Sequence, residues 1–203
     1  MYKKLPKVLS KETLEKLLNS IDLSTPYGVR NYCIVELIYS TGLRVSEVVS
    51  LNLGDIDFYK QIILVKGKGK KQRYVIFNDI TTAWLEIYIK EVRPRLYFMP
   101  TKALFLSYCG KRLTRFGIWY NYKKIAEKIN VSSKLHSLRH TFATDLLKNG
   151  ADLRTIQVLL GHENITTTQI YTHIDNKYLK EAHKKYMPKL SKYFEQPSPT
   201  LLE

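Results

Sequence analysis

Hydrophobic residues recur at helical spacing in the first part of the chain. Ser10 can N-cap a short helix to about Ile21, because Leu14, Leu17 and Leu18 then share one face. The turn-forming run 24–26 interrupts this pattern. A second helix is expected over 27–40, with Gly42 at its C′ position, and a third, short helix over 45–51.

The pattern then changes to the shorter period of β-strands. Residues 61–66 and 73–78 are β-branched and aromatic runs joined by a glycine-containing loop, which predicts a hairpin. Residues 55–58 could add a third strand, and residues 104–106 another short one. Helical spacing returns over 80–93, where we expect Pro94 to end the helix.

The rest of the chain predicts helices only. They are expected over 114–129, 136–149 and 152–160, then from a capping box at Thr166 to Gln169, and finally as a basic stretch over 176–186.

No internal repeat or linker divides this pattern. We therefore expect one domain over 1–190, mainly α-helical with a small antiparallel β-sheet (an α+β fold). The polar, proline-containing residues 191–203 are expected to be a disordered tail.

Charge indicates the kind of partner. The 203 residues include 33 Lys+Arg and 18 Asp+Glu, a net charge of +15. Like charges repel one another in a compact fold, so this excess indicates a polyanionic partner, most commonly nucleic acid. An anionic membrane surface and a merely basic soluble protein are the alternatives. No run approaches the roughly eighteen apolar residues of a membrane span, and no apolar segment follows the basic N-terminus as in a secretory signal.

The cysteines and histidines argue against a metal site. Cys33 and Cys109 lie far apart and outside any CxxC pair, which favours a reducing compartment over a disulfide scaffold or cysteine zinc site. His136 and His140 have i, i+4 spacing, but the pattern lacks the Glu of a metalloprotease, and Arg139 in the same turn opposes a dication. No Walker phosphate-binding loop is present either.

Arg139 has an unusual place for a charged residue. A helical wheel over 136–149 puts it within the apolar arc formed by Leu138, Phe142 and Leu146. A guanidinium that points inward needs a partner, because an isolated buried charge is prohibitive. A structural carboxylate and a substrate phosphate fit equally well at this point.

Other candidates have weaker individual signals. Arg44 and Glu47 could form an ordinary surface ion pair, and Lys68 between two glycines could be a solvated turn. His162 follows a helix-stopping glycine, so it is expected on an accessible turn. Tyr171, nine residues later, differs from most of the fifteen tyrosines only by this position.

Taken together, these stretches resemble the tyrosine recombinase (phage integrase) family, most closely the Xer-type resolvases. The likeness keeps the family's order and spacing over about residues 8–190. The matching stretches are TGLRVSE at 41–47, GKG at 67–69, HSLRH at 136–140, LLGH at 159–162 and TTQIYTH at 167–173.

The resemblance implies a role for each candidate. Tyr171 would be the nucleophile, and Arg44 and Arg139 would clamp the scissile phosphate. His136 would assist proton transfer, while His162 would donate a hydrogen bond to the phosphate. Lys68 would protonate the departing 5′ oxygen, and Glu47 would support Arg44. The expected DNA contacts are Lys70, Lys71, Arg73, His140 and His173.

These residue types suit cleavage of a phosphodiester without a cofactor. Two arginines and a histidine can stabilise the charge that grows on the phosphate oxygens. A phenol with a pKa near 10 needs a proton acceptor, and the 5′ alkoxide needs a proton donor. The 3′-phosphotyrosyl bond stores the energy of the broken linkage, so resealing needs neither ATP nor metal.

The implied activity is site-specific recombination through a Holliday junction. Double-stranded DNA would be the partner, with a tetramer assembled on it and a second recombinase or an accessory protein as a further partner. The implied location is the cytoplasm, in association with the nucleoid. A type IB topoisomerase-like enzyme and a non-catalytic DNA-binding module are the rivals. The former shares the chemistry, and the latter would tolerate loss of Tyr171 or Arg139.

One departure from the family concerns domain organisation. Family members usually carry an N-terminal core-binding domain, whereas here the catalytic pattern starts within ten residues of Met1. We therefore expect the core-binding domain to be absent. A naturally short member, like the fimbrial-switch inversion recombinases, and an excised catalytic domain both remain open.

Overall fold

The computed structural model describes residues 8–67, 72–160 and 173–188, with side chains of the last segment described from residue 178 onward. Eight α-helices and three strands are found within these ranges, so the prediction of a mainly helical chain with a small antiparallel sheet is confirmed. In chain order the elements are α1 (Lys11–Asn19), α2 (Pro26–Thr41), α3 (Val45–Ser50), η1 (Leu53–Asp55), β1 (Ile56–Asp57), β2 (Ile62–Lys66), β3 (Gln72–Ile76), α4 (Asp79–Ile87), η3 (Tyr88–Val92), η4 (Arg93–Leu96), α5 (Arg115–Lys128), α6 (Leu135–Lys148), α7 (Leu153–Leu160) and α8 (His173–Tyr186).

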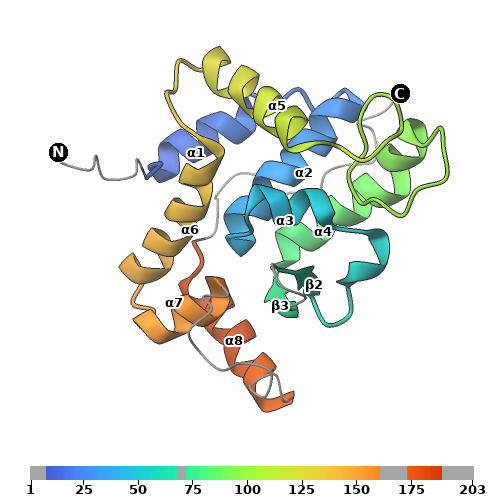
Figure 1. Ribbon diagram of the computed structural model, residues 1–203. Coiled ribbons are helices and arrows are strands. Elements are labelled where there is room, and N and C mark those ends of the chain that lie inside the picture. The colour runs from blue at the N-terminus through green and yellow to red at the C-terminus, as the bar shows by residue number, and fades with distance from the viewer. Residues whose placement is uncertain (1–7, 68–71, 161–172, 189–203) are drawn as a thin grey trace.

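Helix α2 is the centre of the fold. Nearly all of its residues after the first turn are buried, as expected of a helix that is apolar on every side. It packs against α1, α4, α5 and α6, and it runs through the middle of the molecule in Figure 1. Thr25 caps its N-terminus through a hydrogen bond from the Gly28 amide, and Gly42 caps its C-terminus. Its C-terminal end is therefore held firmly inside the core.

The sheet is a three-stranded antiparallel meander in the order β1-β2-β3. Ile63 pairs with Val75 and Val65 with Arg73, which places all four on one face of the hairpin. Ile63, Val65 and Val75 are buried, and the hairpin contacts α3, α7 and α8. Arg73 thus shares the inward face with aliphatic residues.

Two predicted elements differ from the structure. The helix expected to stop at Pro94 leaves α-helical geometry at Ile87, continues as the π-helical turn η3, and ends in the 3₁₀ turn η4, which contains Pro94. Proline fits the first positions of such a turn because its missing N–H has no partner to lose there.

The strand expected over 104–106 is wrong. Only isolated bridges form at Ala103 and Leu106, because side chains hydrogen-bond to the backbone groups that a strand would use for pairing. The buried guanidinium of Arg93 donates to the Ala103 and Leu104 carbonyls, and the Tyr88 hydroxyl donates to Leu104 and accepts from the Leu106 amide.

The last three helices lie together at one end of the molecule (Figure 1). Helix α8 begins a turn before its expected start, and the predicted start near Thr166 lies outside the described residues. Its buried side chains are Leu179, Ala182 and His183, and the His183 Nε2 donates a 2.6 Å hydrogen bond to the Ser40 carbonyl at the end of α2. This bond caps a helix-terminal carbonyl that would otherwise lack a partner.

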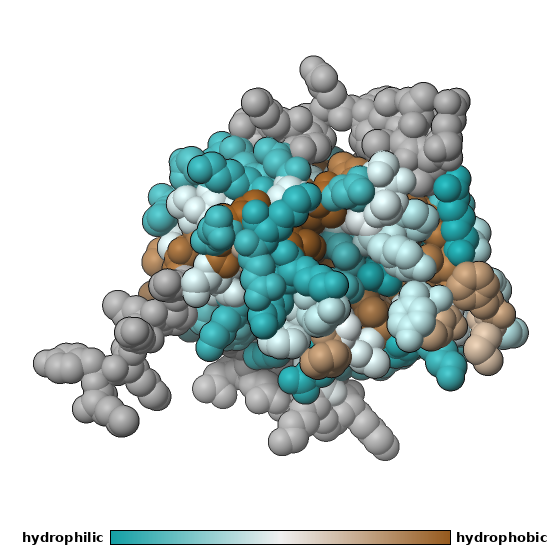
Figure 2. All heavy atoms as spheres, turned by 90° about the horizontal axis from the view of Figure 1, so that it is seen from above, coloured by the Kyte–Doolittle hydropathy of each residue, from teal (hydrophilic) through white to brown (hydrophobic). Residues whose placement is uncertain are grey.

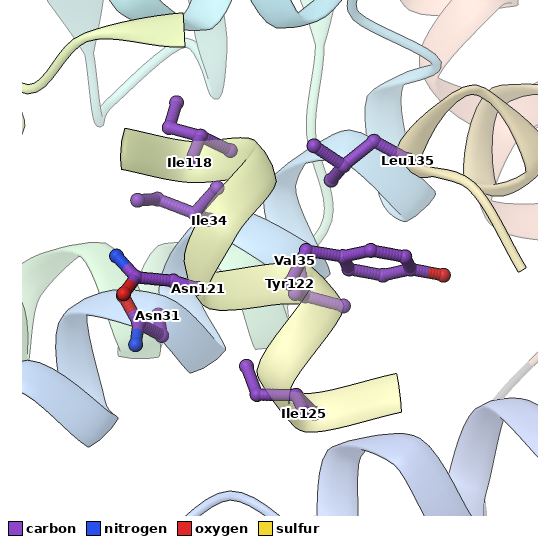
Figure 3. Close-up of a pocket in the computed structure, with 8 residues that line it drawn as sticks. All are labelled: Asn31, Ile34, Val35, Ile118, Asn121, Tyr122, Ile125 and Leu135. Atoms are coloured by element: carbon purple, nitrogen blue, oxygen red, sulfur yellow. The ribbon is translucent and has the colours of Figure 1, made fainter. Parts of the chain in front are cut away.

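A small cavity of about 10 Å³ separates α2 from α5 (Figure 3). Ile34, Val35, Ile118 and Ile125 line most of it. Its size approaches the lower limit for one water molecule, and its lining is mostly aliphatic, so we regard it as a packing defect. Within the described ranges, no helix has both the length and the apolar character needed to span a membrane.

Candidate active site

The turn between α2 and α3 brings three helices to one point. Gly42 has a left-handed backbone with φ of 64°, which favours glycine. A Cβ at this position would lie 2.6 Å from Phe142 Cδ1 on α6 and 2.8 Å from Leu160 Cδ2 at the end of α7. Glycine is therefore required both by the backbone and by the close approach of these helices.

Glu47 is the anion at the start of α3. Its Oε2 accepts the Arg44 backbone N–H at 2.8 Å, and its Oε1 accepts Arg44 Nη1 at 3.2 Å. Arg73 reaches across from β3 and binds both oxygens, at 2.7 and 3.0 Å. One carboxylate thus holds two arginines, and the Arg44 side chain remains 49% exposed while that of Glu47 is 7% exposed.

The charges around Glu47 keep it ionised. Burial alone would raise the pKa of this carboxyl, but the hydrogen bonds and positive charge of Arg73, together with those of Arg44, outweigh burial and lower it. The pair of arginines around one carboxylate leaves a net positive charge at the surface beside Arg44.

Arg139 lies in the wall of the same site. It is buried, as its helical wheel predicted, and it donates to the carbonyls of Gly42 and, at 3.1 Å, of Leu160. Within the described ranges it makes no ion pair, so the structural carboxylate considered from the sequence is not found there. Burial, and then the positive charge of Arg44, lower the pKa of Arg139 to about 10, which leaves it protonated at neutral pH.

His136 and His140 stand one turn apart on α6, with ring centroids 4.3 Å apart. Partial burial, followed by the positive charges of His140, Arg139 and Arg44, lowers the pKa of His136 below its usual 6.5. His136 is therefore largely neutral at pH 7 and can accept a proton. In the part of the chain that the structure describes, no cluster of three or more metal-binding side chains is found.

A cavity of about 770 Å³ connects these groups. Arg44, His136 and Arg139 line one part of it, and Arg115, Phe116 and Trp119 of α5 line another. Phe116 and Trp119 are exposed and pack ring against ring at 5.5 Å. The cavity is open enough for a large ligand, and its charged groups favour an anion. Figure 2 shows one face of the molecule, on which hydrophobic residues lie recessed among hydrophilic ones.

The structure brings Arg44, Glu47, Arg73, His136 and Arg139 into one neighbourhood, with His140 beside His136. The other predicted site residues are not placed by it. Lys68, Lys70, Lys71, His162 and Tyr171 lie outside the described residues, as does the side chain of His173, the first residue of α8.

Sequence reasoning missed two contacts that shape the site. Arg73 was expected to contact DNA, and the structure instead directs its guanidinium to Glu47. The position of Arg73 on the apolar face of β3 was the one sequence signal that its side chain points inward. His183 was not singled out, although Leu179, Ala182 and His183 have the spacing of a buried helix face.

Comparison with known proteins points in one direction. The model of the phage integrase family matches residues 7–177. The tyrosine recombinase XerD of Listeria monocytogenes is 45% identical over 189 residues, which cover 91% of this chain and 64% of that protein. The chain therefore spans less than two thirds of the length of this curated relative.

Solved structures show the same fold. XerA recombinase has a TM-score of 0.71 and 34% identity, over 93% of this chain and 68% of that one. XerH site-specific recombinase, bound to a palindromic difH substrate in a post-cleavage complex, has a TM-score of 0.69 and 34% identity, over 88% of this chain and 53% of that one.

Proposed function

The chain belongs to the phage integrase family of tyrosine recombinases, and from this premise we propose that it cuts and rejoins double-stranded DNA through a covalent 3′-phosphotyrosine bond at Tyr171. The observation that carries the proposal is the convergence of Arg44, His136 and Arg139 on one open cavity. A DNA-bound, post-cleavage relative with the same fold supports DNA as the substrate.

The cationic groups suit the phosphate of the scissile bond. Arg44 is half exposed and Arg139 is protonated at neutral pH, so both can donate hydrogen bonds to the non-bridging oxygens. Charge on these oxygens increases as the nucleophile attacks. Fixed donors therefore bind the transition state more tightly than the ground state.

The proton transfers follow from the remaining roles. The Tyr171 oxygen forms a bond to phosphorus while the bond from phosphorus to the 5′ oxygen breaks. Neutral His136 takes the phenolic proton, and Lys68 gives a proton to the 5′ oxygen. Attack by a 5′ hydroxyl reverses these steps and reseals the strand, and attack by the partner duplex's 5′ hydroxyl gives a Holliday junction.

The remaining assignments extend the same proposal. His162 donates to the phosphate, and Lys70, Lys71, His140 and His173 contact the DNA backbone near the cut. Recombination joins two duplexes, so we propose a tetramer on DNA, with a second recombinase or an accessory protein as a further partner. We place this activity in the cytoplasm, at the nucleoid.

The test is covalent capture on nicked suicide substrates. Candidate sites carry a nick close to the expected cut, so that cleavage releases a short fragment and traps the adduct. The wild-type chain should give a covalent complex on a denaturing gel. Tyr171→Phe should give none while it binds DNA nearly as well, because one hydroxyl adds little to a phosphate-dominated interface. An adduct with Tyr171→Phe would assign the nucleophile to another tyrosine.

Substrates with a sulfur in place of the bridging 5′ oxygen test Lys68. A thiolate leaves without protonation, so Lys68→Ala should be slowed by roughly 10²–10⁴ on normal DNA and restored on the sulfur substrate. Arg139→Ala should not be restored, since it acts on the non-bridging oxygens. Two duplexes in one assay distinguish recombination from topoisomerase-like relaxation, because only recombination exchanges strands between them.

A further inference from the structure

Arg73 joins two parts of the site that lie far apart along the chain. It is the antiparallel partner of Val65, near the end of the hairpin whose loop carries Lys68. Its guanidinium binds Glu47, which in turn binds both the backbone and the side chain of Arg44. A continuous chain of hydrogen bonds thus runs from the hairpin to one of the two clamping arginines.

The geometry of Arg73 does not suit a DNA contact. Two of its nitrogens are committed to the two oxygens of Glu47, and its Nε is buried without a hydrogen-bond partner in the described part of the chain. The side chain is 14% exposed, against 49% for Arg44. A phosphate would meet Arg44 first.

The bidentate contact of Arg73 fixes the orientation of the Glu47 carboxylate, to which Arg44 is hydrogen-bonded. The Arg73–Glu47 contacts, at 2.7 and 3.0 Å, hold the plane of the carboxylate by two points, whereas the Arg44 side chain makes one contact of 3.2 Å. A planar fork imposes an orientation that a single-point cation does not. The orientation of Glu47, and hence the position of Arg44, therefore depends on Arg73.

We infer that Arg73 is a positioning residue, which holds Arg44 through Glu47 in the place where it meets the scissile phosphate. The inference rests on the proposed function and goes beyond it, because Arg73 would act without touching DNA. It replaces the expectation from sequence that Arg73 binds the DNA backbone.

The test separates affinity from the cleavage step. For Arg73→Met we expect the cleavage rate at saturating suicide substrate to fall about 100-fold, the loss typical of a small misplacement of a reacting group. The dissociation constant should change by less than about threefold. The slope of log binding constant against log salt should stay at the wild-type value, because Arg73 itself contacts no phosphate and the charge of Arg44 stays beside the DNA.

Two other variants serve as controls for Arg73→Met. Lys66→Met removes an exposed lysine from the same hairpin, one paired with Asp55 rather than Glu47, and should leave the saturated rate within about twofold of wild type. Arg73→Lys keeps the charge but not the fork, so its rate should lie between those of Arg73→Met and wild type. If Arg73→Met folds poorly, the cleavage rate of Arg73→Lys tests the inference in its place.

The coupling to Glu47 gives an independent readout. Once Arg73 is gone, Glu47 no longer holds Arg44 correctly, so adding Glu47→Gln to Arg73→Met should cost little further rate. Bridging sulfur should not restore Arg73→Met, because Arg44 acts on the non-bridging oxygens.

Several results would overturn the inference. For Arg73→Met, these are a salt slope reduced by about 0.9, full rescue by bridging sulfur, or a wild-type cleavage rate at saturating substrate together with lower heat stability alone. For the double variant, the contradicting result is that the rate losses of Arg73→Met and Glu47→Gln multiply. Failure of the wild-type chain to form any covalent complex would instead overturn the proposed function, and this inference with it.

Discussion

Glu36 is a carboxylic acid enclosed in the core of the domain, and its ionisation should destabilise the fold. It lies on α2, where its Oε1 accepts a 3.4 Å hydrogen bond from the Thr81 hydroxyl of α4. Its Oε2 has no hydrogen-bond partner within the described part of the chain. Burial raises the pKa of Glu36 from 4.5 to about 7, against the opposing effect of the hydrogen bond from Thr81.

The size and sign of the effect follow from this shift. At pH values between 4.5 and 7 the unfolded chain ionises at Glu36 while the folded chain keeps the proton. Folding stability should therefore decrease as the pH rises through this window. At about 1.4 kcal/mol for each pKa unit, the loss approaches about 3 kcal/mol above pH 7 and is absent below pH 4.

Glu36→Gln tests this directly, because the amide cannot ionise. Urea unfolding of both proteins at pH 5, 6, 7 and 8 gives the difference in unfolding free energy at each pH. The variant should gain about 2–3 kcal/mol relative to wild type between pH 5 and pH 8. The cost of burying the amide does not depend on pH, so it cancels in the slope. The titration of His136 and His183 is common to both proteins. A difference that stays constant over this range would refute the raised pKa.

Three further outcomes are expected. Gly42→Ala should lower the unfolding free energy by about 1–3 kcal/mol, because the new Cβ meets Phe142 and Leu160 in a left-handed backbone; urea unfolding measures it, and an unchanged midpoint would contradict the predicted strain. His183→Leu should cost about 1–3 kcal/mol by leaving the Ser40 carbonyl unpaired, and His183→Gln, which keeps a donor, should cost less; equal losses would contradict the hydrogen bond as the cause. Binding to target DNA should weaken with salt at a log–log slope of about −0.9 for each phosphate contacted, and a flat response in a salt titration would exclude DNA as the main partner.

Local signals in the sequence predicted most of the fold. Ser10 caps the helix that was expected to follow it, and Gly42 ends α2 as proposed. The helix expected over 114–129 is present as Arg115–Lys128, with Thr114 as its cap. These elements depend on residues a few positions apart, so the sequence alone contains the relevant information. The strand expected over 104–106 did not form because two side chains from the preceding helical turns, Arg93 and Tyr88, hydrogen-bond to its backbone at Leu104 and Leu106.

The site was harder to predict for the same reason. The wheel placed Arg139 inward correctly, but its actual partners are backbone carbonyls of two other elements, which carry no side-chain signal. The Arg73–Glu47 pair joins β3 to α3, and only the inward position of Arg73 on its strand hinted at it. Long-range partners of charged groups depend on packing, which the local pattern does not reveal.

The sequence separations of these contacts also imply an order of assembly. Glu47 and Arg73 are 26 residues apart, Gly42 and Arg139 are 97 apart, and Ser40 and His183 are 143 apart. Contacts that close short loops form more readily than those that close long ones, and synthesis delivers the N-terminal partners first. A nascent chain that ends before α6 would contain Arg44, Glu47 and Arg73 but would lack Arg139. Under the proposed function such a chain would lack both Arg139 and the nucleophile Tyr171, so incomplete products of translation should be unable to cleave the DNA beside them.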